Sequence, residues 1–273
     1  MSHGAVVHQP HSGKEQEMQM NAYPVVVQPG MGQQGMAPHQ GMMMGPPPNI
    51  MIPAGLPPGL AYLATLNEVQ IHQIMEIAEI LIGWERNNRY DICNSQSQKF
   101  MFAKEDTDCC TRQFCGTARP FVMNVTDNVG QPLMLMNRPF RCHASCLWCC
   151  CLQEMEIESP PGVLQGTVKQ VWTFWTPKYR VYNAQNQCVF TIVGDCCYCK
   201  CCTDVVFRVF DGDGEGNEVA QIVKHWGGCR EIFGGANDFS LRFLADLDLM
   251  RKMLLFGATF LIDFNYFEYR GNN

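Results

Sequence analysis

The stretch "DLDLMRKMLLFGATFLIDFNYFEY", residues 246–269, decides between two architectures. As a helix it is apolar around nearly its whole circumference after Lys252, so it must be surrounded by protein or by lipid. Its aspartates at the start suit the positive end of a helix dipole. The uncharged core, residues 253–262, would be about 15 Å long, against about 30 Å for the hydrocarbon core of a bilayer. It is therefore too short to span alone.

Two residues of this helix distinguish burial in protein from a single transmembrane pass. A longer span would place Asp263 in the hydrocarbon, at roughly 3 kcal/mol. A helix surrounded by strands would leave that carboxylate near its far end, bonded to strand backbone or reaching solvent. Gly257 would then let a strand approach the helix closely. The sequence favours the buried helix over a pass at the C-terminus.

The chain between about residues 89 and 244 consists of short apolar runs separated by Gly, Pro, Asn and Asp turns. Runs such as "KFMFAK", "FVMNV", "VKQVWTFW", "CVFTIV" and "VVFRVF" are typical of strands. Roughly ten to twelve in one continuous series favour a single antiparallel sandwich or barrel over two domains.

The N-terminal part differs in composition. Residues 1–58 are rich in Met, Gln, Gly, Pro and His, which predicts a disordered tail whose prolines could bind a proline-recognising module. Apolar residues then recur at helical spacing from Asn67, and this pattern predicts one amphipathic helix over 67–83.

The sixteen cysteines include two dense clusters, at 142–151 and 196–202. The first thirty residues have no apolar run that could act as an export signal, which points to a reducing compartment and against disulfides. Zinc binding through the C-x-x-C pairs and redox chemistry at "CLWC" are alternatives. Adjacent exposed thiols beside Leu147 and Trp148 favour S-acylation.

Two further features bear on ligands. "DGDGEGNEVAQI" from Asp211 begins like a calcium loop but has Ile222 where a bidentate carboxylate is needed, so an acidic hairpin turn is the better interpretation. The net charge of −6 gives no basic field for a phosphate backbone, so no nucleic-acid partner is expected.

Several long motifs in order resemble the phospholipid scramblase family, over about Pro57 to Tyr269. They are "PPGLAYL", "KEDTDCCTRQFCGTARPF", "NRPFRC", "CLQEMEIESPPG", "KHW" and "LIDFNYFE". The resemblance implies a tubby-like fold in residues 59–270, a closed antiparallel β-barrel of about twelve strands around a hydrophobic C-terminal helix. This agrees with the strand count and with the buried helix.

The resemblance also implies functional residues. Palmitate would be attached at the positions matching the family's acylation cluster, which are Cys146, Cys149, Cys150 and Cys151. The family's calcium segment maps onto residues 235–246, where Asn237, Asp238 and Asp246 are the only amide or carboxylate side chains. Gly235 stands where the family usually has aspartate, so calcium binding should be weak or absent.

The expected activity is ATP-independent, calcium-stimulated movement of phospholipids in both directions between leaflets, without covalent chemistry. The chain would sit at the cytoplasmic face of a membrane, the plasma membrane by resemblance, held by palmitate. One short helix with one aspartate offers headgroups no polar path across a bilayer. The protein would therefore form a homo-oligomer or distort the bilayer. The alternative is an acyl-anchored binding module without scrambling activity.

Overall fold

The computed structural model describes residues 56–74, 87–115, 118–141, 152–195, 203–227 and 237–268, except the side chains of residues 113 and 114. All of these residues belong to one compact unit, residues 45–273. The tail of residues 1–58 lies almost wholly outside the described residues. The disordered tail and the domain boundary therefore stay predictions.

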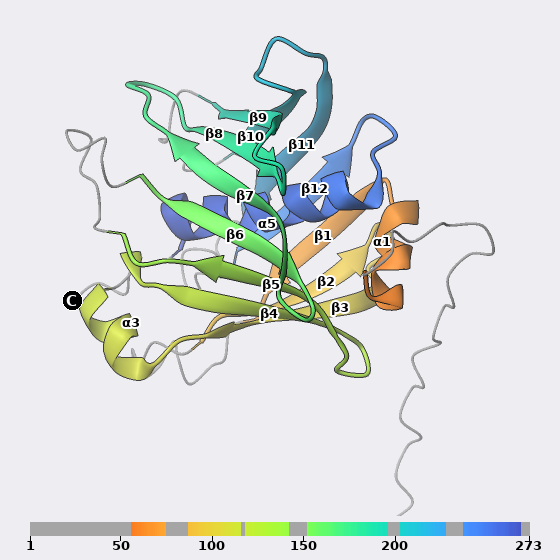
Figure 1. The fold of residues 1–273 in the computed structure, drawn as a ribbon, viewed down its shortest axis with the longest axis vertical. Coiled ribbons are helices and arrows are strands. Elements are labelled where there is room, and N and C mark those ends of the chain that lie inside the picture. Colours follow the sequence, from red (N-terminus) through yellow and green to blue (C-terminus); the bar gives the residue numbers. More distant parts are fainter. Residues whose placement is uncertain are drawn as a thin grey trace, which may run out of the picture. The chain divides into compact units, whose positions relative to one another are not determined.

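The described strands form one closed antiparallel barrel, in which each strand pairs with the next and β12 pairs with β1 (Figure 1). This confirms the predicted mainly β fold and the closed twelve-strand barrel. The strands are β1 (Glu68–Gln73), β2 (Arg89–Asn94), β3 (Lys99–Asp106), β4 (Phe121–Asp127), β5 (Pro132–Arg138), β6 (Glu154–Ser159), β7 (Val163–Val171), β8 (Lys178–Asn183), β9 (Cys188–Gly194), β10 (Val205–Asp211), β11 (Glu218–His225) and β12 (Asp238–Phe243).

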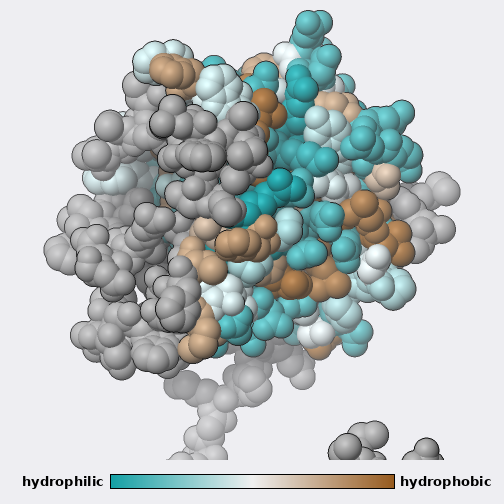
Figure 2. Space-filling view, turned by 60° about the vertical axis from the view of Figure 1, so that its left-hand side comes forward, coloured by the Kyte–Doolittle hydropathy of each residue, from teal (hydrophilic) through white to brown (hydrophobic). Residues whose placement is uncertain are grey.

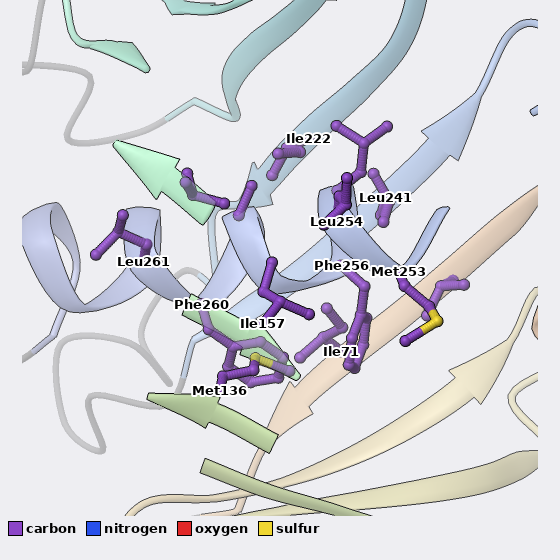
Figure 3. Close-up of a cluster of buried hydrophobic side chains, with 14 of the residues drawn as sticks. Ile71, Met136, Ile157, Ile222, Leu241, Met253, Leu254, Phe256, Phe260 and Leu261 are labelled. Carbon is purple, nitrogen blue, oxygen red and sulfur yellow. The ribbon is translucent and has the colours of Figure 1, made fainter. Parts of the chain in front are cut away.

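Helix α5 (Leu249–Tyr266) fills the barrel, as the buried interpretation of its sequence predicts. Asp248 caps the helix by accepting a hydrogen bond from the Arg251 amide at 2.9 Å. From Lys252 to Phe264 every residue is buried, and Figure 3 shows apolar side chains of α5 packed against inward-facing residues of the strands. In the described part of the chain, no helix has both the length and the apolarity needed to cross a membrane.

Two glycines allow α5 to lie close to β6 and β7. A Cβ atom on Gly257 would stand 2.5 Å from Cδ1 of Ile157, on β6. A Cβ atom on Gly166, on β7, would stand 2.2 Å from the carbonyl oxygen of Tyr182 and 2.7 Å from Cδ2 of Leu254. Real Cβ contacts are longer than this, so Gly166 is required by the backbone of β8, whereas at Gly257 the end of the Ile157 side chain would have to move.

Replacing Gly257 with leucine should therefore overpack the core. We expect Gly257→Leu to lower the free energy of unfolding by about 1–3 kcal/mol, measured by urea denaturation. Gly257→Ala should cost less, because the nearest atoms belong to the flexible end of Ile157. A leucine variant as stable as the parent would mean that this side of α5 does not pack against β6.

The predicted helix over 67–83 is wrong where the structure describes it, because residues 68–73 form β1. Val69 and Ile71 point inward while Gln70 and His72 are only half-buried, which is the alternation of a strand. The helical spacing of the longer segment concealed this short alternation. Pairing with both β2 and β12 closes the barrel at this place.

The short N-terminal helix lies just before β1. A 3-10 turn, η1 (Pro58–Leu60), leads into α1 (Ala61–Thr65), and Leu60 and Leu63 are fully buried. Lys252 fixes the end of this helix, because its ammonium group donates to the carbonyl oxygens of Ala64 at 2.6 Å and Leu66 at 2.7 Å. The helix α1 therefore packs where α5 begins.

Two connections between strands complete the description. The acidic segment 212–217 joins β10 to β11 as the predicted hairpin, and Asp211 next to it pairs with Arg251 at 2.9 Å. Helix α3 (Cys109–Cys115), which the sequence analysis did not predict, connects β3 to β4. Asp108 caps it by accepting from the Thr111 amide at 2.9 Å, and Cys109 and Cys110 are exposed on it.

Candidate functional site

The most polar part of the interior lies at the end of the barrel where α5 ends, here called the C-terminal end. Because neighbouring strands are antiparallel, β1, β3, β5, β7, β9 and β11 all end there. Helix α3 lies on this side in Figure 1, and α1 lies on the opposite side. Three of the connections at this end carry residues with a predicted function. Those between β5 and β6 and between β9 and β10 contain the cysteine clusters, and that between β11 and β12 contains the start of the predicted calcium segment.

A buried ion-pair network closes the C-terminal end. Arg119 donates to both carboxylate oxygens of Glu105, from Nε at 2.6 Å and from the guanidinium at 2.9 Å, and it also contacts Glu268. Asn88 joins the two carboxylates, since its amide donates to Glu105 at 3.1 Å and its side chain to Glu268 at 2.9 Å. Burial disfavours the charge of Arg119, but the bonds and charges of Glu105 and Glu268 raise its pKa above the ordinary value.

Asp263 lies beside this network at the end of α5. Its carboxylate accepts from the Tyr90 hydroxyl and from the Asn237 side chain, both at 2.8 Å. Burial raises the pKa of Asp263 to about 7, although the bonds from Tyr90 and Asn237 and the charge of Lys224 act in the opposite direction. The sequence singled out this residue, and the structure places it inside the protein.

A second buried cation, Arg138 on β5, lies over the same Phe264 ring as Arg119, with its guanidinium carbon 5.9 Å from the ring centre. It donates to the side chains of Gln153 at 2.8 Å and Asn265 at 3.1 Å. Burial lowers its pKa to about 10. The C-terminal end therefore holds cations and carboxylates that fasten the last turn of α5 to strands around the barrel.

The predicted S-acylation residues Cys146, Cys149, Cys150 and Cys151 lie outside the described residues, as does the second cysteine cluster. The described residues on either side show where these segments join the barrel. Arg141 pairs with Glu154, and the carbonyl of Gln153 accepts from the Gln170 amide at 2.8 Å. The described residues on both sides of the first cluster thus lie at the C-terminal end.

The three predicted calcium residues are not brought together. Asn237 is buried, and its side chain bonds Asp263 and the carbonyl of Phe267. Asp238 pairs with His72 at 2.9 Å, whereas Asp246 is exposed beyond the other end of β12. The length of β12, about 17 Å at 3.3 Å per residue, separates them. Within the described ranges no three His, Cys, Asp or Glu residues are grouped to hold a metal ion.

Sequence analysis missed the charged residues of the network, although the strands carry a signal for them. Glu105 continues the inward series of Met101 and Ala103 on β3, and Arg138 continues that of Met134 and Met136 on β5. Extending the alternation by one step predicts that both side chains point into the barrel.

The sequence analysis also passed over three exposed aromatic side chains, Trp172, Phe174 and Trp175, in the connection between β7 and β8. They appeared there only as part of a strand-like run. The alternation of apolar and polar residues does not show where the strand ends, so it cannot tell that these aromatic residues follow β7 and do not belong to it.

The fold and the buried polar network at the C-terminal end define the class of protein, which is a closed antiparallel barrel built around its own C-terminal helix. The sequence profile of the Scramblase family matches residues 47–269, so the chain belongs to that family. It is 44% identical to phospholipid scramblase 1 of Mus musculus over 253 residues, which is 92% of this chain and 75% of the relative. It is 45% identical to phospholipid scramblase 2 of Bos taurus over 247 residues, covering 90% and 82% of the two chains. Phospholipid scramblase 1 of Homo sapiens is 47% identical over 221 residues, covering 81% and 69%. No solved structure matches the chain.

Proposed function

We propose that this protein moves phospholipids between the leaflets of a membrane, in both directions, without ATP and without covalent chemistry. The observation that carries the proposal is the match to relatives named phospholipid scramblase over 92% of this chain, together with the family profile over residues 47–269, which include the barrel, α5 and both cysteine clusters. Its partners would be membrane phospholipids, a second copy of the chain and proline-binding modules that recognise the tail. Its place would be the cytoplasmic face of the plasma membrane.

Reconstitution of the purified protein in liposomes tests this activity directly. A fluorescent phospholipid is placed in both leaflets, and a membrane-impermeant quencher is then added outside. We expect quenching to proceed beyond the outer-leaflet pool when the protein is present, and to stop at that pool in liposomes that went through the same procedure without protein. Equal quenching in the two preparations would refute scrambling.

Calcium stimulation is a separate part of the proposal, and the same assay tests it with added calcium or a chelator. The residues proposed to act are Asn237, Asp238 and Asp246, and calcium binding by them should be weak, because Asp246 lies beyond the far end of β12 from the other two. Because Asp246 is exposed and bonds none of the network, Asp246→Asn should raise the calcium concentration needed for stimulation without altering the fold. An unchanged calcium response would remove Asp246 from the site.

The alternative is an acyl-anchored binding module that does not scramble lipids. The burial of α5 favours it, because the apolar side chains of the helix are already covered by the barrel and offer no path for headgroups. This alternative would be supported if the protein attaches to membranes but quenching in its liposomes stops at the outer-leaflet pool, as it does without protein.

Membrane attachment itself is proposed to depend on palmitate at the first cysteine cluster. Replacing Cys146, Cys149, Cys150 and Cys151 with serine should move the protein from the membrane fraction to the soluble fraction of cells, because several acyl chains are needed for stable anchoring. The thermal midpoint of the variant should stay near that of the parent. Unfolding of the variant, with stoichiometric zinc in the parent, would show that the cluster binds metal instead.

A further inference from the structure

We propose that the connection between β7 and β8, together with three basic side chains beside it, is a docking surface for a bilayer that contains anionic lipids. The connection, residues 172–177, is here called the aromatic loop. The docking surface consists of this loop and the side chains of Lys178, Arg180 and Arg208. The inference rests on the proposed function in assuming that the protein works at a membrane. It goes further by naming the part of the fold that touches the lipid and the lipid charge that it recognises.

The aromatic loop exposes three large side chains. Relative exposure is 72% for Phe174, 71% for Trp175 and 50% for Trp172. The rings of Phe174 and Trp175 contact each other edge to face, with 4.5 Å between centroids. Aromatic and especially tryptophan side chains are enriched where hydrocarbon meets headgroups, since an apolar ring and a polar edge are both satisfied there.

The loop is held in this projecting conformation by the barrel. The Thr173 hydroxyl donates to the Thr176 carbonyl, which closes the loop on itself. Pro177 is buried, and its carbonyl accepts from the Gly194 amide at 2.8 Å. A Cβ atom on Gly194 would stand 2.7 Å from Pro177, so only glycine lets the two strands meet this closely. Because the loop is already ordered, insertion of its rings would not require ordering it again.

The basic side chains follow the loop on the outer wall of the barrel. Lys178 and Arg180 occupy alternate outward positions of β8, and Lys178 and Arg208 both stand opposite Val193 in the sheet. Within the described residues none of the three forms an ion pair, and Nε of Arg180 has no hydrogen-bond partner. The chain as a whole carries −6, so this cluster is a local exception to its acidic character. Basic side chains next to inserted rings are the combination that binds anionic membrane surfaces.

The position of the loop agrees with a membrane at this end of the barrel. The Gln170 amide, two residues before Trp172, bonds the carbonyl of Gln153, which follows the first cysteine cluster. On the other side, Gly194 bonds Pro177 just before the chain leaves toward the second cluster. The loop therefore lies between the points where the two clusters join the sheet. Figure 2 turns this side of the molecule forward and shows separate hydrophobic residues among hydrophilic ones on the described surface.

The test uses the full chain purified without acyl groups, so that only protein surfaces can bind lipid. It is sedimented with vesicles of phosphatidylcholine alone or of phosphatidylcholine with phosphatidylserine. We expect binding to the anionic vesicles, with a blue shift of tryptophan emission. Phe174→Ser with Trp175→Ser, and separately Lys178→Glu with Arg180→Glu, should each weaken binding about tenfold or more, and the charge reversal should abolish the preference for anionic vesicles.

Matched controls separate docking from general loss of apolar or basic surface. Val163→Ser with Leu164→Ser removes exposed apolar side chains at the opposite end of the barrel, and Lys104→Glu reverses an exposed charge on β3. Both should bind within about twofold of the parent, and all variants should keep its thermal midpoint. Binding by the loop variants at the parent's affinity, equal losses in the controls, or no binding to either vesicle would each overturn the proposal. If the protein binds neither kind of vesicle, the exposed aromatic surface would instead be a binding site for another protein.

Failure of this proposal can be distinguished from failure of the proposed function. Protein that binds anionic vesicles through the loop but gives mock-level lipid movement after reconstitution refutes scrambling and leaves docking in place. Protein that moves lipids while its loop variants bind vesicles as the parent does refutes docking and leaves scrambling in place.

Discussion

Glu105→Ala is expected to lower the free energy of unfolding by about 3–5 kcal/mol, because it leaves a buried guanidinium without its main partner. The Glu105 side chain is 0% exposed and that of Arg119 is 3% exposed, so water cannot replace the lost bonds. Glu105 also accepts from the Asn88 amide and from the Thr107 hydroxyl at 2.9 Å. Glu268 would still pair with Arg119, but it lies two residues beyond the end of α5.

Urea denaturation at neutral pH measures this effect, and Glu68→Ala provides a matched control. Glu68 is also a glutamate on a strand and pairs with Arg242 at 3.5 Å, but both side chains are partly exposed. Loss of an exposed pair costs about 0–1 kcal/mol. If the two alanine variants lose the same stability, the C-terminal end does not hold a buried ion pair, and α5 is fixed by apolar packing alone.

The fold could be predicted largely from the sequence, because its main signals are local. Strand alternation between residues 89 and 244 and a short helix that is apolar on all sides together require a sheet wrapped around a helix. The error over 67–83 has the opposite origin. Val69 and Ile71 belong to the first strand, whose partner β12 is more than 160 residues away, so what decides its structure is closure of the barrel.

The site could be predicted less well, because its members meet only through the fold. Glu105 and Arg119 lie 14 residues apart on either side of α3, whereas Glu268 is 149 residues beyond Arg119, and no motif of the sequence shows that the three meet. The residues predicted to bind calcium show the opposite case, in which closeness in the sequence does not bring side chains together. Asp238 and Asp246 are close in sequence, but a strand lies between them, and the structure puts them at opposite ends of it. Asp263 was identified as the single charge in an apolar helix, with strand backbone or solvent as its expected partners. The structure gives it two buried side chains instead, Tyr90 and Asn237, because the segments that carry them meet α5 only in the closed barrel.

Asp263 is also expected to make the stability of the barrel depend on pH. In the unfolded chain its carboxyl releases its proton near pH 3.9, whereas in the folded protein the pKa is raised to about 7. Below about pH 4 both states are protonated and the residue imposes no penalty. As pH rises from about 4 to 7 the unfolded state alone gains the charge, so stability falls. Above about pH 7 the deficit is constant, at up to about 4 kcal/mol.

Asp263→Asn removes this titration while keeping the size and polarity of the side chain. Its amide oxygen can still accept from Asn237, and its amide nitrogen can donate to the Tyr90 oxygen, because a hydroxyl both donates and accepts. We expect the free energy of unfolding of the parent, measured by urea denaturation between pH 4 and 8, to fall relative to that of the variant. The difference between the two curves should be concentrated between about pH 4 and 7 and level off above.

Asp238→Asn is the matched control, since Asp238 is partly exposed at the same end and its pairing with His72 contributes little. Its curve should run parallel to that of the parent. Glu268 remains in every protein compared, and its charge raises the pKa of Asp263, so the fall is expected to be broader than for an isolated group. Parallel curves for the parent and Asp263→Asn would show that Asp263 keeps an ordinary pKa in the folded state. The bonds from Tyr90 and Asn237 and the nearby Lys224 would then outweigh the effect of burial at the end of α5.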